Sequence, residues 1–287
     1  MTLHFIDPLT HGEFHLLMNE SSLGRSFFKH NRAATSLTIA WNNGPKQVAV
    51  IDEMPYEFPE QSILPLMASQ SFRFELPDQV IAWQYNRDFY CIVDHDKEVS
   101  CVGFLFYGFS GMMFIHLPEQ ERRKIDQLFR VFIDEFQTED GIQKDMLQML
   151  LKRLIIILTR LAKKQYIRDP NLPDHKLDII RQYNLLVESH YKEQHQVSFY
   201  ADKLHRSPKT LANLFALYNN KSPLAIIQER LIMEAKRLLI YTDRSAKEIA
   251  YDLGFEDTAY FSNFFKKHTA HPPMDFRRSE SVLLSRQ

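Results

Sequence analysis

The sequence predicts an α+β protein with two domains: a β-rich N-terminal domain that carries helices, and an all-α C-terminal domain. Three observations support this class. Short runs of β-branched and aromatic residues recur up to about residue 117. Apolar residues at helical spacing follow between about 119 and 166. The last hundred or so residues then contain one helical pattern twice, offset by fifty positions.

The β-rich part contains three clear strand-like runs: LTIAW over 37–41, VAVI over 48–51 and VSCVGFLFYGF over 99–109. Several short strands with frequent turns predict a small barrel or sandwich. Cys91 and Cys101 lie in this region, and two cysteines are too few for a disulfide framework or a zinc site. We expect both to be small buried residues.

Two helices are expected next, over about 119–136 and 142–166. Leucines on the second helix are spaced 4-3-4-3, which is the spacing of a seam that packs against a partner helix. We therefore predict a homodimer through Leu147, Leu151, Leu154, Leu158 and Leu161. The alternative is an internal helix that its own domain covers completely.

A linker is predicted at Asp169–Asp174, because two prolines there prevent a helix from continuing. The expected domains are therefore 1–166 for sensing and dimerisation, 167–175 as linker, and 176–287 for the helical repeat. Formal net charge is −1 overall, but residues 175–287 carry 17 Lys and Arg against 13 Asp and Glu. A basic C-terminal part is consistent with nucleic-acid binding without establishing it.

The repeated pattern reads SPKTLANLFALYNNKSP over 207–223 and DTAYFSNFFKKHTAHPP over 257–273. Each copy opens with a helix-capping residue, continues as a short amphipathic helix and ends at proline. The offset pairs Ser207 with Asp257, Leu211 with Phe261, Asn213 with Asn263, Phe215 with Phe265, and Pro223 with Pro273. One supersecondary unit is therefore used twice.

A shorter helix should precede the helix of the second copy. Ser245 and Glu248 have the spacing of a capping box. Gly254 stands where a left-handed residue ends a helix, and Asp257 caps the next one. Two short helices joined by a turn of three or four residues that contains glycine predict a helix-turn-helix unit.

The first copy follows the same plan, with Ser207 as cap and Pro208 at the first helical position. Between the copies a rigid spacer helix is expected from Pro223 to about Ile240. Its apolar stripe would be Leu224, Ile227, Leu231, Ala235, Leu238 and Leu239. A plain helical bundle is the alternative, but two capped units in register favour DNA binding.

The segment from about Val197 to Arg278 resembles the DNA-binding domain of the AraC/XylS family of transcription regulators. The matching residues are AYDLGFEDTAYFSNFFKKH over 250–268, PMDFRR over 273–278, and KSPL over 221–224 with Arg230, Ala235, Leu238 and Leu239. The resemblance covers a little under a third of the chain. It implies a sequence-specific, effector-responsive transcription regulator that docks two recognition helices per protomer in adjacent major-groove segments of double-stranded DNA.

The solvent faces of the two recognition helices predict the DNA contacts. By resemblance, base-edge contacts fall at Lys209, Asn213, Ala259, Tyr260 and Asn263. Phosphate contacts are expected from residues that flank the helices, namely Arg206, Ser207, Lys247, Lys266 and Lys267. For each Lys or Arg taken singly, a solvated surface charge is an equal alternative.

Two departures from the family pattern bear on specificity and on how the second recognition helix ends, and neither changes the expected fold. The family often has Arg where Asn213 and Asn263 stand, and Asn pairs bidentately with adenine whereas Arg favours guanine. We therefore expect adenine-leaning sites. Glycine is usual at Asn220 and Ala270, and because Ala tolerates the left-handed conformation poorly, the second recognition helix should end differently.

By family analogy the β-rich domain is a cupin-like β-barrel, and Tyr85–Cys101 looks more weakly like sensor domains of such regulators. A barrel of this size can enclose one small molecule, which would be the effector, but the sequence leaves open whether one exists. Aromatics that line its pocket, or simply fill its core, would be Phe27, Phe28, Trp41, Phe72, Phe74, Trp83 and Tyr85.

A rival interpretation is an enzyme, a cupin-type catalyst with a DNA module attached. The segment lacks the clustered His and Glu ligands of metal cupins, although His11 and His15 have the i,i+4 spacing of a helical metal pair. No paired nucleophile and base is evident either. We therefore expect no enzymatic activity, no metal and no cofactor.

Another rival is an architectural protein that binds DNA with little base preference and strong salt dependence. Nothing at the N-terminus resembles a signal peptide, and the apolar run at 154–158 is too short to span a membrane. A cytoplasmic location without membrane contact is the expectation. RNA polymerase is the expected partner if the regulator is an activator.

Overall fold

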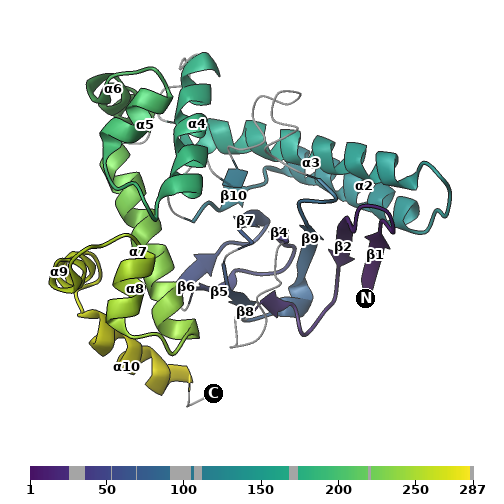
Figure 1. Cartoon of the computed structure of the whole chain (residues 1–287). Helices are drawn as coiled ribbons and strands as arrows, with labels where there is room; N and C mark the ends of the chain where they lie inside the picture. Colours follow the sequence, from purple (N-terminus) through teal and green to yellow (C-terminus); the bar gives the residue numbers. More distant parts are fainter. Residues whose placement is uncertain are drawn as a thin grey trace. The chain divides into compact units, whose positions relative to one another are not determined.

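The computed structural model describes residues 1–25, 36–52, 54–68, 70–90, 105–106, 112–167, 174–218 and 221–284. These form two compact units, one made of the described residues up to Ile167 and the other of those from Asp174 onward (Figure 1). Several predicted features lie outside the described residues: Phe27, Phe28, Cys91, Cys101, Asn220, most of the strand-like run at 99–109, and the linker prolines. No helix in the described part is long and apolar enough to cross a membrane.

The first unit is built on two antiparallel sheets. The six-stranded sheet has the order β1 (Thr2–Ile6), β2 (Glu13–Leu17), β9 (Val80–Tyr85), β4 (Leu37–Asn42), β7 (Ser62–Leu66) and β10 (Ile115–His116). The four-stranded sheet has the order β3 (Gly24–Arg25), β8 (Phe72–Phe74), β5 (Gln47–Ile51) and β6 (Met54–Phe58). A short 3₁₀ helix, Pro77–Gln79, leads into β9.

The two sheets pack face to face around one apolar core. Leu64 and Ala82 of the larger sheet share this core with Phe58 and Phe74 of the smaller one. Within the described residues no strand of one sheet pairs with a strand of the other, so of the two predicted architectures, barrel or sandwich, the structure has the sandwich and not a closed barrel. Side-chain packing holds the sheets together without continuous strand pairing, and the edge strand β6 contains Pro55, which cannot donate a ladder hydrogen bond.

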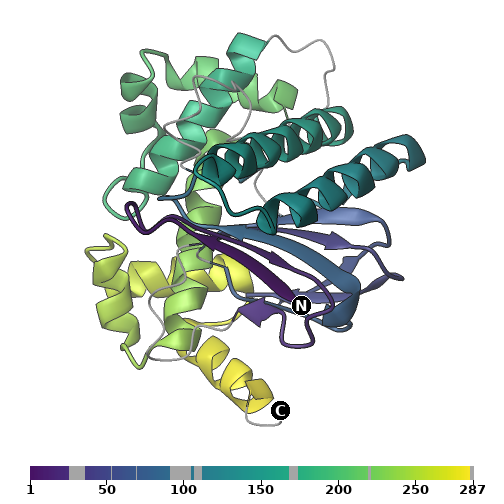
Figure 2. The same cartoon turned by 90° about the vertical axis from the view of Figure 1, so that its right-hand side faces the viewer.

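Helices α2 (Glu119–Phe136) and α3 (Gln143–Tyr166) lie beside each other against the larger sheet (Figure 2). Phe129 of α2 contacts Trp41 and Trp83, with ring centroids 6.5 and 6.2 Å apart. Phe132 contacts Phe14 at 5.7 Å. Both faces of the central strands are therefore covered, which explains why β4 and β7 are buried almost throughout rather than at alternate residues.

The second unit is all-helical. It consists of α4 (Asp174–His190), α5 (Val197–Lys203), α6 (Pro208–Tyr218), α7 (Pro223–Tyr241), α8 (Ala246–Asp252), α9 (Thr258–Thr269) and α10 (Pro273–Leu284). Helix α7 is the predicted spacer, and it contacts helices of both repeats. At its N-terminal end the Tyr183 hydroxyl of α4 donates to the Pro223 carbonyl, 2.8 Å away.

The apolar stripe predicted for the spacer helix is wrong at one position, Leu224. Leu224 is 41% exposed, whereas Ile226 and Ile232 are buried alongside the other predicted positions. Leu224 stands in the first turn of α7, in which Pro223 and Ile226 are buried instead.

Candidate nucleic-acid interface

The first helix-turn-helix unit consists of α5 and α6. The Ser207 hydroxyl accepts the backbone N–H of Thr210 at 3.0 Å, as expected of an N-cap residue. Leu211 and Phe215 have no exposed surface. Because they turn one face of α6 into the core, Lys209 and Asn213 lie exposed on the helix.

The second unit consists of α8 and α9. Ser245 and Glu248 form the predicted capping box, with N–H to side-chain oxygen distances of 2.8 and 3.2 Å. Asp257 caps α9 by accepting the N–H groups of Ala259 and Tyr260 at 2.6 and 3.3 Å. The buried side chains of α9 are Phe261 and Phe265.

All five predicted base-contact residues are exposed on the two recognition helices. Lys209 and Asn213 lie on α6, whereas Ala259, Tyr260 and Asn263 lie on α9. Tyr260 is 64% exposed although it is large and aromatic. An exposed aromatic among polar residues on a capped helix fits a surface that meets a partner.

The turns of the two units differ in length. Four residues, 204–207, separate α5 from α6, whereas five, 253–257, separate α8 from α9, one more than the upper limit predicted. Gly254 has the predicted left-handed backbone, with φ +75°, and His205 takes the equivalent place with φ 52°. The fifty-residue offset aligns Gly254 with Leu204 instead. The turn hydrogen bonds agree with the φ angles, because the Gly254 N–H donates to the Tyr251 carbonyl as the His205 N–H donates to the Asp202 carbonyl.

The end of the second recognition helix corrects another expectation. Ala270 adopts the left-handed conformation, with φ 67° and ψ −13°, and its N–H donates to the Lys266 carbonyl at 2.9 Å. Helix α9 therefore ends as it would with glycine, and Ala270 carries the strain of an L-residue at positive φ.

The predicted phosphate contacts are also exposed: Arg206, Ser207, Lys247, Lys266 and Lys267. The Ser207 hydroxyl already serves as the α6 cap, and the Lys247 ammonium lies 5.9 Å from the centre of the Tyr251 ring. Lys266 and Lys267 stand in the last turn of α9.

Sequence reasoning missed the role of Arg277. Its guanidinium donates to the backbone carbonyls of Leu239, Thr242 and Arg244 at 2.8, 3.2 and 2.6 Å. It thereby satisfies carbonyls at and just beyond the end of α7. The family-matching sequence PMDFRR includes this arginine, but nothing in the sequence distinguishes a residue that caps a helix from one that contacts DNA.

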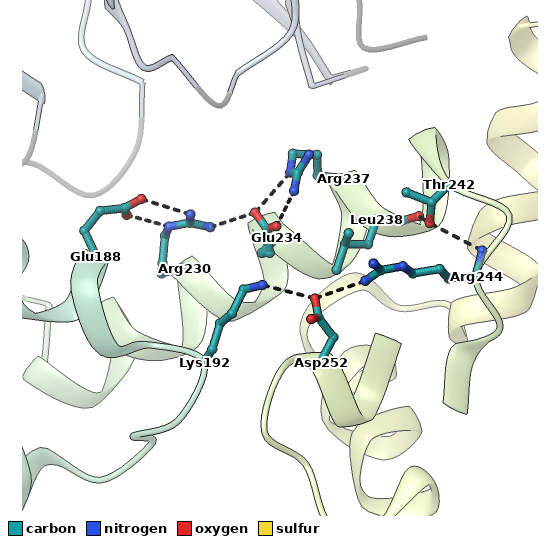
Figure 3. Close-up of polar contacts among 9 residues, drawn as sticks. All are labelled: Glu188, Lys192, Arg230, Glu234, Arg237, Leu238, Thr242, Arg244 and Asp252. Carbon is teal, nitrogen blue, oxygen red and sulfur yellow. Dashed lines mark hydrogen bonds and ion pairs between the residues drawn. The ribbon is translucent and has the colours of Figure 1, made fainter. Parts of the chain in front are cut away.

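Two arginines of α7 are bound inside the second unit (Figure 3). Arg230 pairs bidentately with Glu188 of α4 at 2.6 and 3.0 Å and also contacts Glu234 at 3.3 Å. Arg237 donates to Glu234 at 2.5 and 3.1 Å. These contacts fasten α4 to the spacer helix.

Electrostatics keep this network charged. Burial opposes ionisation of Arg230, but the hydrogen-bonded Glu188 carboxylate outweighs burial and raises the pKa of the guanidinium. Burial likewise acts to raise the pKa of Glu234, whereas the Arg237 and Arg230 guanidiniums hold that pKa below its usual value.

The predicted dimer seam is used inside the first unit. The five leucine side chains of the predicted seam are between 0 and 8% exposed. They are Leu147, Leu151, Leu154, Leu158 and Leu161. Because a fully buried side chain cannot contact a second molecule, α2 and β10 take the place of the expected partner helix. The exposed side of α3 instead carries Met149, which is 65% exposed.

A groove of about 810 Å³ lies along the exposed surfaces of α2 and α3. Its apolar lining includes Met149, Ile156 and Ile157, and its cationic lining includes Arg153, Arg160 and Lys164.

The structure separates the residues considered for a ligand or a metal. Phe72 and Phe74 lie in the core between the sheets, whereas Trp41 and Trp83 pack against α2, so they do not line one pocket. His15 lies in β2 and not on a helix. Among the residues that the structure describes, no group of three or more His, Cys, Asp and Glu could hold a metal ion.

Comparison with known proteins matches residues 200–279 to a family model described as a helix-turn-helix domain. The chain is 30% identical over 98 residues to the HTH-type transcriptional activator RhaS of Citrobacter koseri, a match covering 34% of this chain and 35% of the relative. It is 25% identical over 136 residues to RhaS of Salmonella arizonae, covering 47% of each. The matched region thus spans between about a third and a half of these relatives. The structure of ToxT from Vibrio cholerae aligns with a TM-score of 0.40 and 15% identity, over 93% of this chain and 97% of that one.

Proposed function

Because the chain belongs to the AraC/XylS family of transcription regulators through its C-terminal helix-turn-helix domain, we propose that it binds double-stranded DNA in a sequence-specific manner and regulates transcription. One observation carries the proposal: α6 and α9 are two capped helices that each bury one face and expose polar residues on the other. Such helices suit insertion into the major groove, where each base pair presents a distinct pattern of donors and acceptors.

The spacer helix supports binding to neighbouring major-groove segments. Helix α7 has 19 residues, which at 1.5 Å per residue gives a length of roughly 28 Å. Successive major-groove faces are about 34 Å apart. A modest bend in the DNA would bring the two sub-sites to the spacing of the two recognition helices.

Selection from a random duplex library tests the proposal, with the full chain at fixed salt. A specific regulator enriches one motif with two sub-sites about one helical turn apart. An architectural DNA binder enriches no motif, and its affinity falls steeply with added salt. Selected sequences that bind no better than scrambled duplex over a range of salt concentrations would overturn the proposal.

The first unit is the proposed sensing and dimerisation part, with limits at 1–166, a linker at 167–175 and the DNA-binding domain at 176–287. A small molecule bound to this cupin-like unit can change DNA binding only by favouring one arrangement of the protein over another. The curated relatives are named as activators, so activation through RNA polymerase is the proposed direction of regulation. Native mass spectrometry of the purified chain tests for a retained small molecule.

The proposed homodimer interface is the exposed stripe of α3, not the buried leucines. Ile142, Met146 and Met149 are all at least 40% exposed, and their spacing continues to Arg153 and Ile156. Acidic residues gather near the start of α3 at Glu139, Asp140 and Asp145, whereas basic residues gather towards its end at Arg153, Arg160 and Lys164. An antiparallel second copy would bring opposite charges together.

A further inference from the structure

We infer that a second connection, besides α7, fixes the relative position of the two helix-turn-helix units. The loop between α4 and α5 leads into the first helix-turn-helix unit. This loop contacts the turn between α8 and α9 of the second helix-turn-helix unit. We call this connection the clasp: Lys192 and His195 of the loop, with residues 252–255 at the end of α8 and in the α8–α9 turn. As a determinant of DNA-site spacing, it rests on the proposed function.

Three side-chain contacts form the clasp. The Lys192 ammonium lies 3.1 Å from the Asp252 carboxylate (Figure 3). His195 Nε2 lies 2.9 Å from the Leu253 carbonyl oxygen, and because a carbonyl only accepts, that nitrogen carries the proton. The His195 ring also packs on Phe255, with centroids 4.8 Å apart. These partners lie about sixty residues apart in sequence, so the clasp is a tertiary contact.

Backbone also meets backbone at the clasp. A Cβ atom added to Gly254 would lie 1.9 Å from the Lys192 carbonyl oxygen and 3.3 Å from His195 Nε2. Glycine is therefore required at this position for two reasons: the left-handed turn, and the close approach of the loop.

The α4–α5 loop is itself anchored to α5, in the first helix-turn-helix unit, and to α7. The fully buried Tyr200 of α5 donates its hydroxyl to the Gln194 carbonyl at 2.7 Å. Arg230 of α7 stacks over the Tyr191 ring at 4.0 Å while it pairs with Glu188. Because the loop is anchored in this way, its contact with Gly254 constrains the two helix-turn-helix units relative to each other.

We expect the clasp to affect the relative position of the two helix-turn-helix units more than the folding stability of the helical domain. Lys192 and Asp252 are 36% and 32% exposed, and an ion pair at such a site contributes little to folding. Helix α7 alone would still permit the two helix-turn-helix units to twist and bend relative to each other along its length. A second contact away from the helix axis opposes those motions.

A fixed distance between the two recognition helices should make DNA binding sensitive to the spacing of the two sub-sites. One inserted base pair shifts the second sub-site by roughly 3.4 Å and rotates it by about 34°. A protein with fixed recognition helices cannot follow that change, so it should bind the altered site at least about tenfold more weakly.

The distance between the recognition helices tests the clasp without DNA. Spin labels are placed at Ala212 of α6 and Lys267 of α9 in the full chain through an unnatural amino acid, which leaves the cysteines unlabelled. Lys192→Ala combined with His195→Ala should at least double the width of the measured distance distribution. Arg244→Ala is the matched control, since Arg244 pairs with the same Asp252 carboxylate at 3.4 Å but lies in the connection between α7 and α8 and not in the α4–α5 loop.

In the control the distribution should stay as narrow as in the wild type. An unchanged width in the double variant would overturn the inference, whatever the protein binds. The single variant Lys192→Ala removes only a partly exposed side chain and should broaden the distribution less, whereas Lys192→Arg should restore it. If the selected duplex is available, the double variant should lose less than about threefold in affinity on insertion of one base pair; a wild type that tolerates the insertion would also overturn the inference.

Discussion

Asn213 and Asn263 occupy the same register on the two recognition helices, and both are exposed. An asparagine in the major groove can pair with adenine through two hydrogen bonds. Asn263→Ala should therefore weaken binding to the selected duplex by about 1–3 kcal/mol and relax the preference at one base pair. Competition binding against a panel of single-base variants measures both effects.

Lys266→Ala is the control for that experiment. A phosphate contact carries no base information, so this variant should weaken all sequences about equally and reduce the salt slope by about one. An unchanged base preference in Asn263→Ala would remove Asn263 from the set of base contacts. A sequence-dependent effect of Lys266→Ala would mean that its role is misassigned.

Ala270 gives a stability prediction at a single residue. Its left-handed backbone is strained for alanine and not for glycine, so Ala270→Gly should stabilise the domain by about 1 kcal/mol. Urea unfolding monitored by circular dichroism measures the change. Ala212→Gly, at an exposed position inside α6, should instead destabilise by about 1 kcal/mol. Equal signs for the two variants would contradict the assignment.

At the scale of elements, Asp7 joins the turn after β1 to helix α3. Its carboxylate accepts hydrogen bonds from Lys144, from the Thr10 hydroxyl at 2.6 Å and from the Leu9 N–H at 2.9 Å. These bonds, led by the one from Lys144, hold the pKa of Asp7 well below its usual value of 3.8. The charged form is thus stabilised by folding.

The contribution of Asp7 to stability should depend on pH. Because its pKa is lower in the folded state, the contribution is fully present above pH 4 or so and is lost as pH falls towards the folded pKa. Asp7→Asn should be less stable than the wild type at pH 7, and the gap should shrink below about pH 4. Urea midpoints at pH 7 and pH 3 measure this gap, with Asp126→Asn as a surface control. A gap that does not depend on pH would rule out the Asp7–Lys144 pair as its cause.

Helix α3 shows how one spacing pattern fits two environments. The leucine stripe packs inside the unit, and the exposed stripe beside it has the same 4-3 spacing. Spacing tells which residues share a face of a helix, but not what covers that face. The sequence therefore predicted the helix and its apolar face, and of the two interpretations left open for that face the burial of the leucines supports the one in which the helix's own domain covers it.

At the scale of the whole molecule, self-association should depend on exposed residues of α3. Met149→Asp should shift sedimentation velocity profiles from dimer to monomer, because it places a charge in the proposed apolar contact. Val131→Asp, at an exposed apolar position on α2 outside the groove, should leave the dimer intact. Leu154 is unsuitable for this test, since replacing a fully buried leucine by alanine already costs about 2–5 kcal/mol of stability. A persistent Met149→Asp dimer would move the interface elsewhere.

By itself, the sequence determined the local structure of the C-terminal part. Capping residues, apolar spacing and prolines act within a few residues, so the helix ends at Ser245, Asp257 and Pro223 were predictable. The exposed faces of the recognition helices follow from the same periodicity.

Only the tertiary structure decided which elements cover one another. The two-sheet sandwich, the use of the leucine stripe inside the first unit, the capping of α7 by Arg277 and the contact of Lys192 with Asp252 all join residues far apart in the chain. Such contacts depend on packing, and a single sequence does not encode them in any spacing that can be counted.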